Sequence, residues 1–161
     1  MSQQATARRD RVFLVVVDDS PERMVALRYA CLRALKSGGR VALLRVIEQA
    51  EGAVWGAVAD LMQSERREEA ERTLNALAAD VNTITGGLPI LLVREGVPRD
   101  ELLALLEEDP RISILVLAAS VDSSGPGPLI SALAGRYASR LHVPMTIVPG
   151  GMTEEELDRV T

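Results

Sequence analysis

The residues best suited to chemistry lie in a glycine-rich segment between two regular patterns. An apolar run at residues 115–119 is followed by serines, glycines and prolines, including Gly125 and Gly127, and helical spacing of apolar residues resumes at Leu129. Glycines let backbone amides approach a phosphate closely, and the first turn of a helix adds unpaired N–H groups and a positive dipole end. The segment therefore predicts an anion pocket, with simple turn residues as the alternative interpretation.

The pattern along the chain predicts the strands and helices that must hold this segment in place. Apolar runs rich in β-branched residues predict buried strands, and apolar residues at helical spacing predict helices. The expected strands are residues 12–17, 41–47, 88–93, 112–119 and 143–148, and the expected helices are residues 21–37, 57–81, 98–107, 129–141 and 154–160. Thr153 and Glu156 match a capping box at the start of the last helix. The alternation predicts an α/β fold with a doubly wound, Rossmann-like sheet of five parallel strands.

Sheets of this type bind ligands beyond the carboxyl ends of their strands, at the point where the strand order reverses. The loop after the first expected strand holds Asp18, Asp19 and Ser20, and the loop after the fourth is the glycine-rich segment. Two independent arguments therefore indicate the same crevice.

Length and composition indicate one domain over residues 1–161. Residues 1–10 are polar and are expected to form a flexible N-terminal arm, and residues 150–161 are expected to form a C-terminal extension with a short helix. No uncharged apolar run approaches the roughly 20 residues of a membrane-spanning helix, and no secretory signal is recognisable. A net charge of −5 argues against a nucleic-acid surface, and the single cysteine, Cys31, suits a reducing compartment. We expect a soluble cytoplasmic protein with no membrane or nucleic-acid partner.

Several enzyme classes lack the residues that they need. Lys36 is the only lysine, and no P-loop precedes it. A receiver domain would need an aspartate at the end of the third strand and a lysine at the end of the fifth, where this chain has Val-Arg-Glu at 93–95 and Val-Pro-Gly at 148–150. His142 is the only histidine, and no serine lies in a nucleophile elbow. The sequence offers no catalytic group and no metal-ligating set, and slow ATP hydrolysis is the most that we expect.

Three segments together resemble the universal stress protein family. They are Val15-Val16-Val17-Asp18-Asp19-Ser20 at the first strand-to-helix turn, Glu95-Gly96-Val97-Pro98 before the third helix, and the glycine-rich segment. The resemblance covers nearly the whole chain. It implies strand order 3-2-1-4-5, an adenine nucleotide alpha hydrolase-like arrangement, a homodimer formed through the last strand, and binding of ATP. Some members of the family bind no nucleotide.

The family's ATP motif, Gly-x-x-Gly-x9-Gly followed by Ser or Thr, is only partly matched. Counting back from Gly135 places Gly125 at the second glycine and Asp122 at the first, and Arg136 replaces the final hydroxyl. The stretch from Gly135 to Pro144 is also about four residues short, close to one helical turn. Arg136 is then either a phosphate ligand through its guanidinium fork or a solvated helix arginine.

A competing alignment places Ala119 and Ser120 at the Gly-Ser position of the motif. Elsewhere, the resemblance implies that Asp18 contacts the nucleotide and that Val46 touches adenine. Asp18 could accept a hydrogen bond from an adenine amine or a ribose hydroxyl, or it could cap the following helix with the two residues after it. Both interpretations stay open from the sequence.

The resemblance implies a nucleotide-binding site made of Val17, Asp18, Ser20, Val46, Ala119, Ser120, Gly125, Gly127, Gly135 and Arg136. Its expected ligand is ATP or AMP with Mg²⁺, and the expected function is that of a homodimeric cytoplasmic stress-response protein. The alternative is a family member that binds no nucleotide and acts as an interaction module for a protein partner. An enzyme of adenylyl or phosphoryl transfer would need a lysine or paired carboxylates at the crevice.

Overall fold

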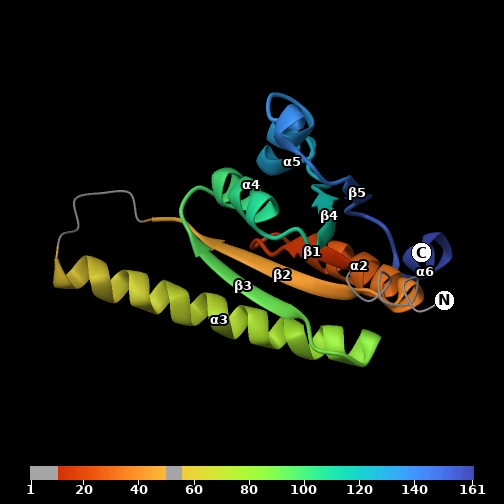
Figure 1. Ribbon diagram of the computed structural model, residues 1–161, viewed down its shortest axis with the longest axis horizontal. Helices are drawn as coiled ribbons and strands as arrows, with labels where there is room; N and C mark the ends of the chain where they lie inside the picture. Colours follow the sequence, from red (N-terminus) through yellow and green to blue (C-terminus); the bar gives the residue numbers. More distant parts are fainter. Residues whose placement is uncertain (1–10, 50–55) are drawn as a thin grey trace.

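A computed structural model describes residues 11–49 and 56–161 of the chain, and the arm expected at residues 1–10 lies outside the described residues. Its strands form one sheet in the order β3-β2-β1-β4-β5, and every neighbouring pair is parallel (Figure 1). The strands are β1 (Val12–Val16), β2 (Arg40–Ile47), β3 (Ile90–Glu95), β4 (Ile112–Ala119) and β5 (Met145–Pro149). The predicted fold class and strand order are confirmed.

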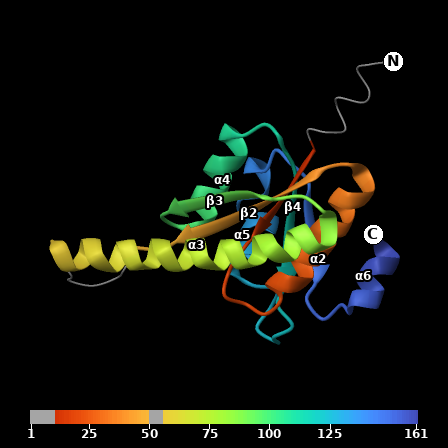
Figure 2. The ribbon, with the colours of Figure 1, turned by 90° about the horizontal axis from the view of Figure 1, so that it is seen from below.

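Helices cover both faces of this sheet. They are α2 (Arg23–Ser37), α3 (Ala57–Thr85), α4 (Pro98–Glu108), α5 (Pro128–Ala134) and α6 (Glu154–Val160). Figure 1 shows α3 below the sheet and α4 and α5 above it, and Figure 2, seen from below, shows α2 and α3 on the same side. Each crossover therefore carries its helix to one of two layers, as the doubly wound arrangement requires.

The alternation of side chains along β1 divides the core between the two faces. Phe13 and Val15 pack with α2 and α3 in one buried cluster, and Val12 and Leu14 pack with α4 and α5 in the other. Successive strand residues point to opposite faces, so a strand buried on both sides must be apolar at every position. This is the reason that β1 appears in the sequence as a continuous apolar run.

The helix expected at residues 129–141 is shorter than predicted. It ends at Ala134, and after Gly135 the chain forms only a short 3-10 turn, η1 (Ala138–Arg140). Gly135 leaves the helical conformation, with φ −102° and ψ −110°, and a Cβ added there would lie 2.9 Å from the carbonyl oxygen of Ser131. The end of this helix therefore depends on a glycine that lets the chain turn back against it.

Other element bounds differ by a few residues. The helix predicted to end at residue 81 continues to Thr85, and Gly86 at φ +76° caps it. The third strand begins at Ile90, where pairing with β2 starts, and Leu88 lies outside it and is exposed. Thr153 and Glu156 form the reciprocal capping box at the start of α6. Among the described residues, no helix is long and apolar enough to span a bilayer.

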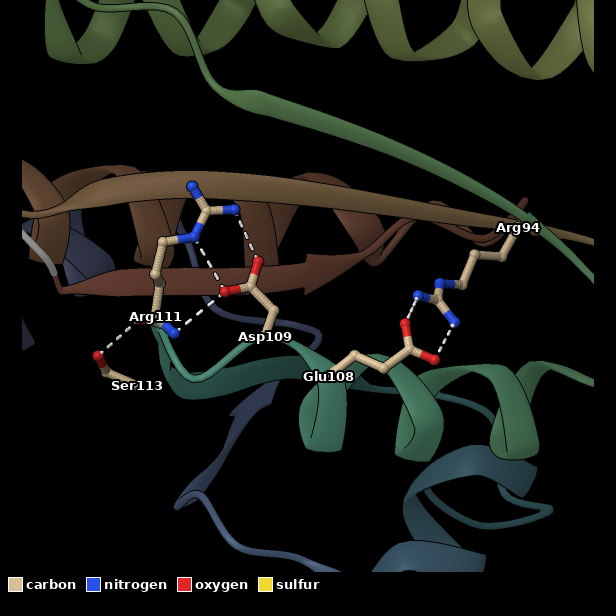
Figure 3. Close-up of polar contacts among 5 residues, drawn as sticks. All are labelled: Arg94, Glu108, Asp109, Arg111 and Ser113. Atoms are coloured by element: carbon tan, nitrogen blue, oxygen red, sulfur yellow. Dashed lines mark hydrogen bonds and ion pairs between the residues drawn. The ribbon is translucent and has the colours of Figure 1, made fainter.

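Ion pairs hold the end of α4 beside the sheet and define the turn into β4 (Figure 3). Arg94 on β3 donates to Glu108 at the end of α4. Arg111 donates to Asp109 through its side chain, with Nη2 2.7 Å from Oδ2, and through its backbone N–H, 3.1 Å from Oδ1. Hydrogen bonds from Arg111 lower the pKa of Asp109, and hydrogen bonding from Arg94 lowers the pKa of Glu108. These pairs fix the start of the strand that leads to the glycine-rich loop.

Candidate functional site

Two cavities open beyond the carboxyl ends of the central strands, and Asp18 lines both of them. The first cavity, about 520 Å³, lies between the ends of β1 and β2 and the helix α3. The second cavity, about 480 Å³, lies between the turn after β1 and the glycine-rich loop after β4. We call the two together the cleft. It occupies the place that the reversal of strand order predicts for a ligand.

The turn after β1 shapes the junction of the two cavities. Oδ1 of Asp18 accepts hydrogen bonds from the backbone N–H of Ser20, at 2.9 Å, and from its hydroxyl, at 2.6 Å. These bonds close a local turn, so the side chains do not cap α2, whose N-cap residue is Glu22 without a side-chain capping bond. The helix-cap interpretation is therefore wrong. Oδ2 of Asp18 has no hydrogen-bond donor among the described residues and remains available to a ligand.

The glycine-rich loop is closed by its own hydrogen bonds. The N–H of Ser120 donates to the carbonyl of Pro126 at 3.1 Å, and the N–H of Asp122 donates to the hydroxyl of Ser120 at 3.1 Å. Gly125 and Gly127 have φ values of +114° and +112°, a region that L side chains rarely adopt. Glycine is therefore needed at both positions for the path of the loop.

Hydroxyls and amides supply the donors of the second cavity. Four serines line it, Ser20, Ser120, Ser124 and Ser131, and the hydroxyl of Ser20 is the one already donated to Asp18. Behind them α5 begins at Pro128, which has no N–H, so the unpaired donors of its first turn are the amides of Leu129 and Ile130. The N–H of Gly127 also has no acceptor among the described residues. These are neutral donors of the kind that bind a phosphate oxygen.

Charged side chains line the first cavity. The guanidinium of Arg45 donates to the carbonyl of Val17 at 3.1 Å and to Oδ1 of Asp19 at 2.8 Å. Arg66 of α3 donates to the carbonyl of Glu48 at 3.1 Å. The two guanidiniums therefore hold the ends of β1 and β2 and the following segment in place beside the opening.

The structure brings together most, but not all, of the residues predicted for the site. Val17, Asp18 and Val46 line the first cavity, and Asp18, Ser20, Ser120, Gly125 and Gly127 line the second. Ala119 lies between two second-cavity residues at the end of β4 but is not itself part of the lining.

Gly135 and Arg136 line neither cavity, because they follow the far end of α5. The guanidinium carbon of Arg136 lies 5.8 Å from the ring centroid of Tyr137, and that of Arg99 lies 4.3 Å from the same centroid. Arg136 thus contacts an aromatic ring at the surface, and the described structure gives it no position from which to hold a phosphate in the cleft.

Some residues of the site escape prediction from sequence. Arg66 and Glu69 line the first cavity, and nothing in the charged stretch around them distinguishes them from residues of a solvated helix. Arg45 carried one usable signal, because it is a lone charge in the apolar run of β2, next to Val46. Glu22 is the buried charged residue of the described core, at 8% exposure, and no local pattern marked it.

The described residues hold no group of three or more side chains able to ligate a metal ion. Asp18 still offers one free carboxylate oxygen at the junction of the cavities. Mg²⁺ is usually held by one or two carboxylates together with substrate phosphates and water. The site therefore fits a metal ion that arrives with a phosphate, with Asp18 as its protein ligand.

The model of the Universal stress protein family matches residues 11–149, and the chain belongs to that family. No curated protein matches the chain. Among solved structures, it is similar to the universal stress protein UspA from Lactobacillus plantarum, with 18% identity and a TM-score of 0.68 over 87% of this chain and 98% of that one.

Two further solved structures were determined with ligands. A universal stress protein in complex with cAMP has 15% identity and a TM-score of 0.60, covering 88% of this chain and 98% of that one. A universal stress protein family protein from Arabidopsis thaliana with AMP bound has 13% identity and a TM-score of 0.58, covering 91% of this chain and 94% of that one. At these identities the similarity demonstrates a shared fold.

Proposed function

We propose that this protein binds an adenine nucleotide in the cleft. The observation that carries the proposal is the position of Asp18, which joins a cavity lined by Val17 and Val46 to a cavity lined by glycine amides and serine hydroxyls. An adenine nucleotide has a flat aromatic base, a ribose with hydroxyl donors and a phosphate, in that order. The cleft presents matching surfaces in the same order.

Each part of the nucleotide would meet a defined group. Val17 and Val46 would contact the base, and when no metal ion is bound the free Oδ2 of Asp18 would accept a hydrogen bond from a ribose hydroxyl. The amides of Gly127 and of the first turn of α5 would donate to the phosphate. Mg²⁺, when bound, would neutralise phosphate charge beside Asp18. The relatives solved with cAMP and with AMP support a ligand of this class.

We further propose a homodimer that forms through β5 and acts in a cytoplasmic stress response. β5 pairs with β4 alone and so leaves one edge of the sheet unpaired, and Ile147 on it is 42% exposed. An exposed edge strand is a template for pairing with a second chain. Analytical ultracentrifugation tests this part, because a monomer at micromolar concentration would contradict it.

Thermal melting tests nucleotide binding. A ligand at about 100 times its dissociation constant adds about 2.7 kcal/mol to the free energy of unfolding, which raises the melting temperature by several degrees in a domain of this size. We expect this rise with AMP, cAMP or Mg-ATP and its loss in Gly125→Val. Gly86→Val is the matched control, because Gly86 also has a positive φ and open space around it but lies at the far end of α3. That variant should be destabilised yet keep the ligand-induced rise.

The hydrogen bonds within the glycine-rich loop favour a second candidate. Because the amides of Ser120 and Asp122 are already satisfied, the loop needs no ligand to be stable. In this case the protein acts as an interaction module without nucleotide. No melting shift with any adenine nucleotide, together with an unchanged dimer in Gly125→Val, would support this candidate over the first.

A further inference from the structure

The second cavity contains a negative charge and no positive one. Asp18 is the charged residue of its lining, and the other lining residues are serines, glycines, prolines and an alanine. Phosphate sites in proteins commonly add an arginine or lysine to the backbone donors. Here the described lining offers neutral donors alone, so the phosphate charge would meet a carboxylate without a cationic side chain.

The first cavity does not supply the missing positive charge. Its lining includes the carboxylates of Asp18, Asp19, Glu48 and Glu69 and the guanidiniums of Arg45 and Arg66. Arg45 is already paired with Asp19 at 2.8 Å. Arg66 donates to the carbonyl of Glu48 at 3.1 Å and does not line the second cavity. Acidic side chains therefore outnumber basic ones around this cavity as well.

Arg23 is the basic residue next to the junction, and it is also engaged. Its guanidinium donates to the carbonyl of Asp18 at 2.9 Å, and it lines neither cavity. It partly offsets the charge of Asp18 without facing the space that a phosphate chain would occupy. Counted over the described residues, the lining of the cleft therefore carries more acidic than basic side chains.

We propose that the cleft selects adenine nucleotides of low charge and admits ATP only with a bound Mg²⁺. This inference rests on the nucleotide-binding function proposed above. Hydroxyls and amides can satisfy the oxygens of one phosphate, but each additional phosphate adds negative charge beside the carboxylate of Asp18, which repels it. Cyclic AMP carries about one negative charge, AMP about two and free ATP about four. The expected order of affinity without metal is therefore cyclic AMP and AMP above ADP, and ADP above ATP.

Titration calorimetry of the full chain at low ionic strength tests this order, first with a chelator and then with millimolar Mg²⁺. We expect AMP to bind at least about tenfold more tightly than free ATP. Mg²⁺ should reduce the difference in affinity between AMP and ATP, and added salt should reduce it as well, because salt screens the charges. Free ATP binding as tightly as AMP would overturn the inference while leaving the proposed function intact. Binding of no adenine nucleotide would overturn both.

A charge variant tests the cause of the selection. Ser131→Lys places an ammonium group on the wall of the second cavity, at an exposed position of α5. It should raise the affinity for free ATP about tenfold relative to that for AMP. Asn82→Lys adds the same charge at an exposed position near the far end of α3 and should leave the ratio unchanged. If the ratio of the affinity for free ATP to that for AMP were the same in the two variants, charge in the second cavity would not be the cause of the preference for AMP.

Discussion

The carboxylate of Glu22 accepts a hydrogen bond from the backbone N–H of Val121, with 3.2 Å between Oε1 and the nitrogen. Glu22 lies just before α2, and Val121 follows β4 in the glycine-rich loop. The same side chain packs against Gly150, where an added Cβ would lie 3.2 Å from the Cβ of Glu22. One buried side chain thus joins the segments that follow β1, β4 and β5, next to the second cavity.

Replacing Glu22 should loosen this junction. Glu22→Ala leaves the N–H of Val121 without its acceptor and opens space around Gly150, so we expect the free energy of unfolding to fall by about 1–3 kcal/mol. Glu22→Gln keeps an acceptor oxygen of similar shape and should cost less. Chemical denaturation measures both. If the two variants were equally stable, the hydrogen bond to Val121 would not be a source of stability.

Gly150 should tolerate no side chain, whereas its neighbour should. A Cβ at Gly150 would overlap the carbonyl oxygen of Ala119 and the side chain of Glu22, but a Cβ at Gly151 would make an ordinary contact 3.6 Å from Val121. We expect Gly150→Ala to lower the free energy of unfolding by about 1–3 kcal/mol and Gly151→Ala to change it by less than about 0.5 kcal/mol. Equal effects in denaturant titrations would contradict the packing at this turn.

The thiol of Cys31 should be inert in the native protein. Cys31 is fully buried on the core face of α2, and burial raises the pKa of its thiol to about 12. Since the thiolate is the reactive form, a thiol reagent at about pH 8 should modify the native protein far more slowly than the unfolded chain. A saturating nucleotide should slow the reaction further if the reaction requires unfolding. Rapid modification of the native protein would contradict the burial.

Asp109 should make stability depend on pH in the acid range. The pKa of Asp109 in the folded protein lies below the ordinary value because Arg111 donates hydrogen bonds to its carboxylate. The carboxylate therefore contributes fully to the free energy of unfolding above its unfolded-state pKa, and this contribution is lost as the pH falls through its folded-state pKa. Asp109→Asn should therefore be less stable than the wild type by up to about 1 kcal/mol near pH 7, with the difference vanishing near pH 2. Melting temperatures across this range measure it.

The control for that experiment is Glu71→Gln on α3. Glu71 is exposed and has no ion-pair partner among the described residues. At neutral pH the melting temperature of Glu71→Gln should be closer to that of the wild type than the melting temperature of Asp109→Asn is. If the melting temperatures of Asp109→Asn and the wild type differed by the same amount from neutral to acid pH, the charge of the Asp109 carboxylate would not be a source of stability.

The sheet was predictable because its central strands are buried on both faces. Full burial forces β1, β2 and β4 to be almost continuously apolar, a pattern that stands out locally. Apolar spacing predicted the wrong end for α5. Leu133, Tyr137 and Leu141 continue an apolar spacing of four beyond Gly135, but the chain turns at that glycine and the later residues pack from a 3-10 turn and a loop.

The polar part of the site was less predictable because its partners are far apart in the sequence. Asp18 and the glycine-rich loop could be found, since each follows directly on a strand. Arg45 bonds a residue 26 positions away, and Glu22 bonds one 99 positions away. No local pattern encodes such a pair. The closed hydrogen bonding of the glycine-rich loop likewise depends on its folded path and could not be inferred from its composition.

The most direct test of nucleotide binding in the cleft is an NMR titration of the isotopically labelled protein with AMP. We predict that the backbone amide signals of Asp18, Val46 and Gly127 shift most, because these residues line the two cavities that meet at Asp18. The signals of α6, none of whose residues line either cavity, should stay in place. Unchanged spectra at millimolar AMP, or shifts confined to residues outside the cleft, would contradict the account.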